Sequence, residues 1–365
     1  MSETTADRDG LLPIFDGHND VLLAVYGGGR RSERRSFFER GSSGHLDLPR
    51  AREGGFAGGF FAVYVPPDPA SRRPPMRSAD APSEEEEWAT LPPPVDQPFA
   101  LRLAMSLTAT LFRIEEESAG EVEVVRDVAS LRRCLDAGTL AAILHFEGAE
   151  AIDPQLNALD VFYRAGLRSL GLVWSRPNAF AEGVPFRFPS SPDTGPGLTA
   201  AGRDLVRACN RKGIMVDLSH LNERGFWDVA ELSTAPLVAT HSNAHAVTPT
   251  PRNLTDAQLD AVKASGGVVG VNFAVSFSRE DGKHEADTPI DALVRHFDYL
   301  CDRMGVEHVA FGSDFDGTTV PNELGDAAGL PRLVEALRSA GFGEADLRKL
   351  GTENWVRVLE RTWKA

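Results

Sequence analysis

The sequence predicts an α/β fold, a (β/α)8 TIM barrel, from two observations. The 365-residue chain contains eight short apolar runs rich in β-branched residues, with helical patterns between them. Five of these runs end in polar clusters that contain histidine or acidic residues. Near-continuous apolar strands that alternate with helices indicate a parallel sheet with a covered outer face, and eight such units suggest a closed barrel. An open doubly wound sheet is the alternative.

The predicted strands are, in chain order, residues 13–15, 59–65, 141–146, 169–174, 214–218, 237–240, 268–273 and 309–312. Two of the helices between them are expected at 198–211 and 256–264, the second with Thr255 or Asp256 as its cap. No Gly-x-Gly-x-x-Gly motif opens a helix after the first strand. The dinucleotide-binding form of the open sheet therefore has little support.

The length allows two domains at about 150 residues each, but single α/β barrels routinely reach about 250 residues or more. Residues 66–98 differ in composition from the rest, since they hold 10 of the 24 prolines and four consecutive glutamates at 84–87. Such a segment cannot bury enough apolar surface to fold alone. We therefore expect one domain over residues 1–365, with 66–98 as a surface insertion or lid. A domain boundary at 66–98 is the less favoured alternative.

The charge balance argues against one class of function. The chain has 38 Lys and Arg against 53 Asp and Glu, a formal net charge of −15, whereas binding a phosphate backbone needs a concentrated positive surface. The sequence shows neither an export-signal pattern nor a run of about 18 apolar residues. We expect a cytoplasmic protein with no nucleic-acid partner and no membrane contact. A homodimer is the default expectation, because two-fold dimers are the commonest assemblies.

The active site of such a barrel is built from the carboxyl ends of the strands. The polar clusters at these ends are Asp16-Gly17-His18-Asn19-Asp20, His145-Phe146-Glu147-Gly148, Asp217-Leu218-Ser219-His220, Thr240-His241-Ser242-Asn243 and Gly312-Ser313-Asp314-Phe315-Asp316-Gly317. Taken singly, each cluster is also compatible with a helix cap or a core histidine. Together they collect imidazoles and carboxylates, which are typical ligands of first-row metals.

Three histidines and two carboxylates form the predicted ligand set, which is His18, Asp20, Glu147, His220 and His241. In an extended segment the side chains of His18 and Asp20 point to the same side. Five ligands exceed what one tetrahedral catalytic zinc holds, so two metals are predicted. Glu147 is the natural bridge, because a carboxylate has two oxygens. A bridged pair of cations lowers the pKa of a shared water toward neutrality, which predicts hydrolysis of a carbonyl or phosphoryl centre.

These motifs, together with Asp47-Leu48-Pro49-Arg50 and Arg252-Asn253, resemble those of the membrane (renal-type) dipeptidase family, metallopeptidases of the amidohydrolase superfamily. The resemblance runs in order from about residue 12 to the C-terminus. It implies an amidohydrolase-like barrel, dipeptidase activity and two zinc ions per chain. His18 and Asp20 would bind one zinc, His220 and His241 the other, and Glu147 would bridge them.

The resemblance also implies roles in catalysis and in substrate binding. Asp314 would be the acid/base residue, with Asp316 as its nearest rival. Arg252 would hold the C-terminal carboxylate of a small dipeptide, because a guanidinium can donate two parallel hydrogen bonds to it. Tolerance of a D-configured C-terminal residue is expected as well.

The chain departs from the family pattern after the fourth predicted strand. Where the family has Leu-Thr-His, the chain reads Leu172-Val173-Trp174, and an indole donates one hydrogen bond but cannot take up a proton. Trp174 and Asn178 are predicted to border the substrate, with Arg176 as another candidate for stabilising an oxyanion; plain packing is an equal alternative for Trp174.

Two other functions stay open, and the departure at Trp174 favours the first of them. One is a related barrel hydrolase that acts on N-acyl amino acids, lactams or lactones. The other is a catalytically silent scaffold that binds a partner through residues 66–98. The remaining histidines have no partners at metal-like spacing, and only His245 is expected near the ligands; they are His45, His145, His245, His284, His296 and His308.

Overall fold

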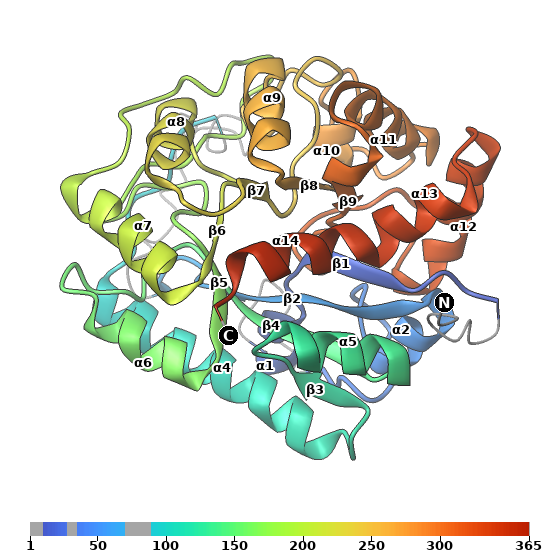
Figure 1. Ribbon diagram of the computed structural model, residues 1–365, viewed down its shortest axis with the longest axis horizontal. Helices are drawn as coiled ribbons and strands as arrows, with labels where there is room; N and C mark the ends of the chain where they lie inside the picture. Colours follow the sequence, from blue (N-terminus) through green and yellow to red (C-terminus); the bar gives the residue numbers. More distant parts are fainter. Residues whose placement is uncertain (1–9, 28–34, 70–88, 365) are drawn as a thin grey trace, which may run out of the picture.

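Eight parallel strands form a nearly closed barrel in the computed structural model, which describes residues 10–27, 35–69 and 89–364 (Figure 1). In hydrogen-bonded order the strands are β1 (Ile14–Asn19), β2 (Phe56–Tyr64), β4 (Leu140–Glu147), β5 (Leu167–Gly171), β6 (Met215–Asp217), β7 (Val238–Ala239), β8 (Val268–Val271) and β9 (Val309–Phe311). The predicted TIM barrel is confirmed, and each predicted strand overlaps one of these eight. A further short strand, β3 (Val122–Val124), was not predicted; it pairs with the first residues of β4.

The barrel closes between β1 and the segment that follows β9. The backbone N–H of Asp20 donates to the carbonyl of Phe315 at 2.8 Å, and the N–H of Asp314 donates to the carbonyl of His18 at 2.9 Å. Closure of the barrel thus brings together chain segments almost 300 residues apart. The same hydrogen bonds place three predicted site residues beside one another.

Helices surround the barrel, and the last of them, α14 (Asn354–Thr362), runs across one of its ends (Figure 1). They are α1 (Val21–Tyr26), α2 (Leu48–Gly54), α4 (Gln97–Glu117), α5 (Val128–Ala137), α6 (Asn157–Ala165), α7 (Ala200–Lys212), α8 (Glu223–Leu232), α9 (Asp256–Ser265), α10 (Val275–Ser278), α11 (Asp291–Met304), α12 (Leu330–Ser339), α13 (Glu344–Arg348) and α14 (Asn354–Thr362). The predicted helices correspond to α7 and α9. Thr255 caps α9, and its N–H donates to the side chain of Gln258 at 2.8 Å, as in a capping box.

The alternation of side chains along β4 separates two apolar layers. Leu144 and Phe146 belong to the layer between the strands and the outer helices. Ala141 and Ile143 belong to the barrel interior, where they share a cluster with Trp355 of α14. Because side chains of a strand alternate between its faces, His145 and Glu147 continue the inward row above Ile143. The apolar interior therefore supports the functional groups from below.

Gly17 lets β1 approach the centre of the barrel. A Cβ at this position would lie 2.1 Å from the carbonyl oxygen of Thr240 and 2.7 Å from the ring of Trp355. Any larger residue would push β1 away from β7 and from α14, so the glycine between Asp16 and His18 serves packing.

Two other expectations concern the chain as a whole. Residues 70–88, which include the four glutamates of the predicted insertion, lie outside the described residues, and the single-domain organisation stays a prediction. Within the described ranges, none of the helices combines the length and the apolar character needed to cross a membrane.

Candidate metal centre

Glu147, at the end of β4, lies at the centre of the predicted ligand cluster. Its Oε1 is 2.9 Å from Nε2 of His220 and 3.7 Å from Nε2 of His241. Its Oε2 is 3.7 Å from Nε2 of His18. The Nε2 atoms of His220 and His241 are 3.1 Å apart. The two carboxylate oxygens therefore face different imidazoles, while the rings of His18 and His241 lie close together, with 3.9 Å between their centroids.

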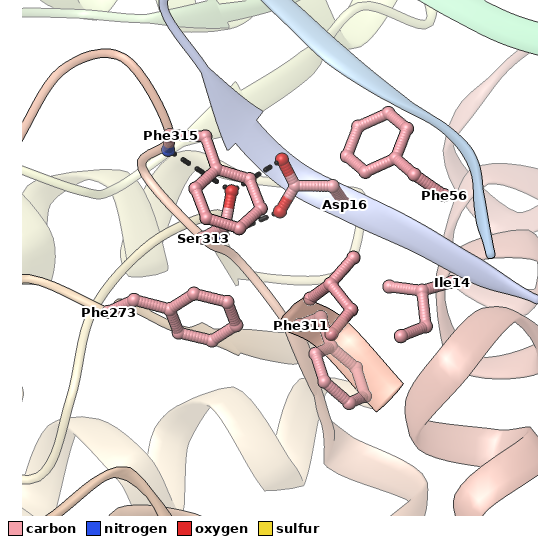
Figure 2. Close-up of a pocket in the computed structure, with 8 residues that line it drawn as sticks. Ile14, Asp16, Phe56, Phe273, Phe311, Ser313 and Phe315 are labelled. Carbon is pink, nitrogen blue, oxygen red and sulfur yellow. Dashed lines mark hydrogen bonds between the residues drawn. The ribbon is translucent and has the colours of Figure 1, made fainter. Parts of the chain in front are cut away.

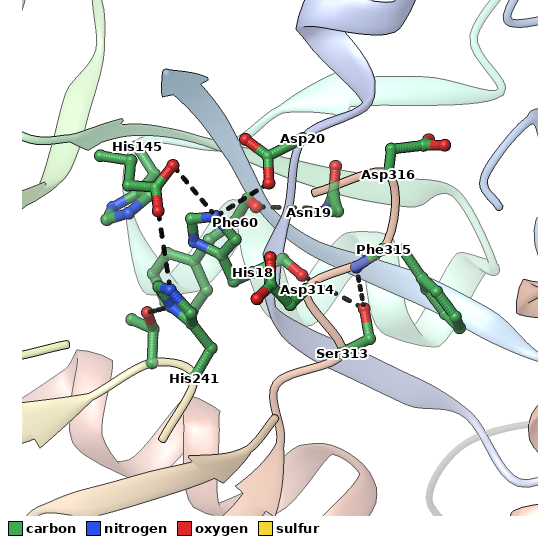
Figure 3. Close-up of polar contacts among 12 residues, drawn as sticks. His18, Asn19, Asp20, Phe60, His145, His241, Ser313, Asp314, Phe315 and Asp316 are labelled. Atoms are coloured by element: carbon green, nitrogen blue, oxygen red, sulfur yellow. Dashed lines mark hydrogen bonds and ion pairs between the residues drawn. The ribbon is translucent and has the colours of Figure 1, made fainter. Parts of the chain in front are cut away.

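His18 connects two sets of candidate ligands (Figure 3). Nε2 of His18 is 3.4 Å from Oδ2 of Asp20. Candidate ligand atoms of His18, Asp20 and Asp314 all lie within 4.8 Å of one another, and so do those of His18, Glu147 and His241. All five predicted ligands are thus brought together at the carboxyl end of the barrel. Their partition between two ions remains a prediction.

Several buried polar atoms of the cluster lack hydrogen-bond partners, as expected of atoms that bind a cation. Nδ1 and Nε2 of His18 and Oδ1 of Asp20 are buried and have no hydrogen-bond partner among the described residues. Buried polar atoms are normally hydrogen-bonded, so orphaned atoms at one point indicate a missing partner. Imidazole and carboxylate donors suit zinc and other first-row metals.

The electrostatics of the cluster also favour positive charge. Burial lowers the pKa of His18, but the carboxylates of Glu147, Asp20 and Asp314 outweigh burial and raise it to about 10. Burial, and then the charge of Asp20, raise the pKa of Glu147 well above its ordinary value. A cation placed among these carboxylates would relieve their repulsion.

The other two histidines differ from His18, because burial is the largest cause of their pKa shifts and is not outweighed by carboxylates. Burial lowers the pKa of His220 and of His241 well below the ordinary value. Both rings are therefore neutral near pH 7, and the neutral imidazole is the form that binds a metal.

Hydrogen bonds behind the ligands fix the orientation of two rings. Nδ1 of His220 lies 2.8 Å from Oγ of Ser175. Nδ1 of His241 lies 2.8 Å from Oγ1 of Thr240, which in turn donates to Oδ2 of Asp217 at 2.6 Å. Such contacts leave the Nε2 atom of each ring directed at the cluster.

His145 also lies beside the cluster, although its spacing in the sequence predicted no metal-like partner. Its ring is fully buried, lies edge-on to His18 with 5.3 Å between ring centroids, and its Nδ1 is 2.8 Å from Oγ of Ser169. The available signal was its position two residues before Glu147 on one strand, which places both side chains on one face. His245, expected near the ligands, instead has Nε2 3.0 Å from the carbonyl of Ser190.

Asp16 joins the ends of β1 and β9 behind the cluster (Figure 2). Its carboxylate accepts hydrogen bonds from the N–H of Ser313 at 2.6 Å and from Oγ of Ser313 at 2.9 Å. Phe56 and Phe273 are among the aromatic side chains around it, and burial raises the pKa of Asp16 to about 7. The pair anchors the loop that carries Asp314.

The two acidic residues of this loop have different surroundings. Oδ2 of Asp314 accepts a hydrogen bond of 2.8 Å from the side chain of Asn272, and burial raises the pKa of Asp314 to about 6. The carboxylate of Asp316 instead binds Arg35 at 2.6 Å and the N–H of His45 at 2.7 Å. Asp314 therefore contributes to the cluster, whereas Asp316 holds a neighbouring segment. The sequence did not lead to a predicted role for Asn272, although it is a polar residue directly after β8.

Arg252 carries donors that no described residue uses. Its side chain is buried, and Nη2 donates to the carbonyl of His241 at 3.2 Å. Nε and Nη1 have no partner among the described residues. The guanidinium carbon lies 5.2 Å from the ring centroid of Phe277. A buried cation with unused donors beside the cluster can bind an anionic group.

The other residues predicted to border the substrate have diverse contacts. The ring centroid of Trp174 lies 5.9 Å from that of His220. Asn178 instead donates to the carbonyl of Leu172 at 2.8 Å and accepts from the N–H of Phe180 at 2.8 Å. Arg176 is buried, with Nε 2.9 Å from Oε1 of Glu150. Trp174 thus borders the cluster, while the contacts of Asn178 and Arg176 give them structural roles and leave their predicted roles untested.

Comparisons with known proteins agree with this arrangement. A family model described as membrane dipeptidase (peptidase family M19) matches residues 10–365. A solved metallopeptidase from Rhodobacter sphaeroides, bound to a phosphinate mimic of the dipeptide L-Ala-D-Ala, is 51% identical with a TM-score of 0.89, and the alignment covers 97% of this chain and 100% of that one.

Two further relatives extend the comparison. A Klebsiella pneumoniae protein, described as uncharacterized and named for the pqqA 5′ region, is 52% identical over 70% of this chain and 94% of its own. An amidohydrolase from Pseudomonas aeruginosa is 21% identical over 96% of each chain with a TM-score of 0.71, which shows an amidohydrolase-like fold.

Because the family model covers nearly the whole chain, and because a solved metallopeptidase of half-identical sequence shares its fold, the resemblance seen in the motifs is confirmed. The chain belongs to the membrane dipeptidase family, peptidase family M19, and is a hydrolase of the peptidase class with a candidate metal centre.

Proposed function

We propose that this protein is a binuclear zinc dipeptidase that hydrolyses the peptide bond of small dipeptides and tolerates a D-configured C-terminal residue. The observation that carries the proposal is the placement of Glu147, whose Oε1 faces His220 and His241 while its Oε2 faces His18. The dipeptide class is supported by the family and by the L-Ala-D-Ala mimic bound in the Rhodobacter sphaeroides relative.

The five clustered ligands would hold the metal. His18 and Asp20 would hold one ion, His220 and His241 would hold the other, and Glu147 would contact both. When bound, the ions would supply the Lewis acidity that polarises the scissile carbonyl and lowers the pKa of the attacking water.

Asp314 would move the proton. Its carboxylate is grouped with His18 and Asp20, and Asn272 fixes its orientation through Oδ2. A carboxyl group whose pKa is raised to about 6 can accept a proton from water and release it near neutral pH. Asp314 would therefore take the proton from the attacking water and deliver it to the amine of the departing C-terminal residue.

Arg252 would select substrates by their free carboxylate. Its Nε and Nη1 lack partners among the described residues, and a carboxylate can accept both in a parallel pair of hydrogen bonds. A C-terminal residue that directly follows the scissile bond would reach Arg252 and the cluster together, which would confine cleavage to the last peptide bond of a substrate, the single bond of a dipeptide included.

The proposal is tested by the metal content of the purified protein and its rates on matched L,L and L,D dipeptides. We expect about two zinc ions per chain and turnover of both stereochemical series. One zinc ion with full activity would refute the binuclear centre, and turnover confined to the L,L series would refute D-residue tolerance.

Trp174 supports a second candidate function. It stands where the family has a histidine, and its ring lies 5.9 Å from His220. An aromatic surface beside the reaction centre would also accommodate an acyl group, and Arg252 would still bind the carboxylate of an N-acyl amino acid. Rates on N-acyl amino acids measured beside the dipeptides separate the two candidates, because only the first requires a free amino group.

A further inference from the structure

Three aromatic side chains form a continuous surface beside the metal cluster, which we call the aromatic wall: Trp174, Phe186 and Phe277. The ring centroid of Phe186 lies 5.6 Å from that of Trp174 and 5.9 Å from that of Phe277, and the rings of Phe186 and Phe277 are stacked at an interplanar angle of 14°. All three side chains are half-buried. The wall therefore presents apolar surface that a ligand can contact.

The aromatic wall connects the two groups that would hold the ends of a substrate. At one end, the rings of Trp174 and Phe186 lie 5.9 and 6.4 Å from that of the metal-ligand candidate His220. At the other end, the guanidinium of Arg252 lies 5.2 Å from the ring of Phe277. The wall therefore borders both groups.

The wall is supported from behind. Arg176 lies 5.0 Å from the ring centroid of Trp174 and 5.5 Å from that of Tyr64. The fully buried Arg176 is itself ion-paired with Glu150 at 2.9 Å. Trp174 is thus held by a cation–π contact with a fixed cation. A preorganised surface of this kind discriminates between side chains better than a mobile one.

We propose that the aromatic wall receives the C-terminal side chain of the substrate and selects dipeptides in which that side chain is apolar. This inference rests on the proposed dipeptidase function. With the carboxylate at Arg252 and the scissile carbonyl at the cluster, the Cα of the C-terminal residue lies between them, alongside Phe186 and Phe277. An apolar side chain gains contact there, whereas an acidic one loses water beside the negative faces of the rings.

The test uses the zinc-loaded full-length protein and four substrates, Ala-Gly, Ala-Ala, Ala-Leu and Ala-Glu, with L and D forms assayed separately. We expect kcat/KM to rise from Ala-Gly through Ala-Ala to Ala-Leu in at least one stereochemical series. A buried methylene group typically changes specificity by about 10-fold or more, so Ala-Leu should exceed Ala-Gly by at least about 10-fold. Ala-Glu should fall at least about 10-fold below Ala-Leu, because its carboxylate loses water beside the negative ring faces.

Substitutions in the aromatic wall test whether the wall causes this substrate preference. In Phe186→Ala the ratio of kcat/KM for Ala-Leu over Ala-Gly should fall by about 10-fold, and Phe186→Leu should restore part of it. Phe277→Leu is a second variant that shortens the wall and should lower the same ratio. The control is Phe188→Ala, on the same loop but 39% exposed and outside the wall, which should leave the ratio unchanged.

The outcomes separate the preference from the proposed function. Equal kcat/KM for all four dipeptides, or an unchanged ratio in both wall variants, would overturn the preference and leave the dipeptidase intact. Failure to hydrolyse any dipeptide, Ala-Gly included, would overturn the proposed function and the preference with it.

Discussion

Asn272 donates a hydrogen bond of 2.8 Å from its side-chain amide to Oδ2 of Asp314. The first residue directly follows β8 and the second lies beyond β9, so the contact joins two neighbouring strand ends at the carboxyl end of the barrel. The amide fixes one oxygen of a carboxylate that is grouped with His18 and Asp20. This arrangement favours Asp314 over Asp316 as the acid/base residue.

Replacement of Asp314 should separate metal binding from turnover. Because the predicted ligand set is complete without it, Asp314→Asn should retain the metal content of the wild type while kcat falls by about 10²- to 10⁴-fold. Asp316→Asn is the matched control, since the Asp316 carboxylate binds Arg35 and His45 instead. Activity retained in Asp314→Asn, with loss in Asp316→Asn, would reverse the assignment.

The sequence was sufficient to predict the strands of the barrel. Buried parallel strands are near-continuous apolar runs, and each run is visible without knowledge of its neighbours. The strand β3 was missed because Glu123 interrupts the apolar run of Val122–Val124. Closure between β1 and β9 depends on backbone bonds across almost 300 residues, such as that between Asp314 and His18. No local pattern records such a pairing.

The site was predictable where it lies at strand ends. His18, Glu147, His220 and His241 follow apolar runs, and the barrel brings such positions together. The contacts of Asn178 and Arg176 were not foreseeable, because they depend on backbone carbonyls and on a buried glutamate that only the folded loops supply. Phe186, in the loop between β5 and β6, carries no sequence signal that distinguishes a wall residue from a packed one.

The Thr240 hydroxyl should control metal affinity through His241. Thr240 links Nδ1 of His241 to Oδ2 of Asp217 by contacts of 2.8 and 2.6 Å. Thr240→Val keeps the shape of the side chain and removes the hydroxyl, so metal affinity should fall about 10- to 100-fold. Thr240→Ser, which retains the hydroxyl, should bind the metal nearly as well as wild type. Competition with a chelator measures the affinities. Equal affinities in the valine and serine variants would show that the Thr240 hydroxyl does not control metal binding through His241.

The role of Arg252 can be checked with substrates that lack its target. Arg252→Met removes the guanidinium but keeps an apolar stem beside Phe277, and kcat/KM for a dipeptide should fall by about 10²-fold. A dipeptide amide, which has no free carboxylate, should be a poor substrate for the wild type and should lose little further in the variant. An equal loss of kcat/KM on both substrates would show that Arg252 supports the structure of the protein and does not bind the substrate carboxylate.

His296 should make the stability of the protein depend on pH. The ring, on α11, accepts a hydrogen bond of 3.3 Å from the N–H of Ala244, and burial lowers the pKa of His296 from 6.5 to about 3. Below pH 6.5 the His296 side chain binds a proton in the unfolded chain but stays neutral in the folded chain. The stability contributed by this neutral ring is therefore present above pH 6.5 and is lost as the pH falls toward 3.

Replacement of His296 tests this dependence. One proton taken up on unfolding lowers the free energy of unfolding by about 1.4 kcal/mol for each pH unit below 6.5. His296→Gln keeps a polar side chain. Between pH 6 and pH 4, the free energy of unfolding of this variant should fall less steeply with decreasing pH, by the amount that corresponds to about one proton. Urea denaturation of both proteins under the same metal conditions gives the slopes. If the free energies of unfolding of the two proteins depend on pH in the same way, His296 does not take up a proton on unfolding in this range.

The binuclear centre is tested most directly by titrating chelator-treated protein with zinc while hydrolysis of an alanyl dipeptide is followed. Glu147 with His18 on one side and His220 and His241 on the other predicts that the metal-free protein is inactive and that activity saturates at two equivalents of zinc per chain. Full activity at one equivalent, or activity that survives complete removal of metal, would contradict the account.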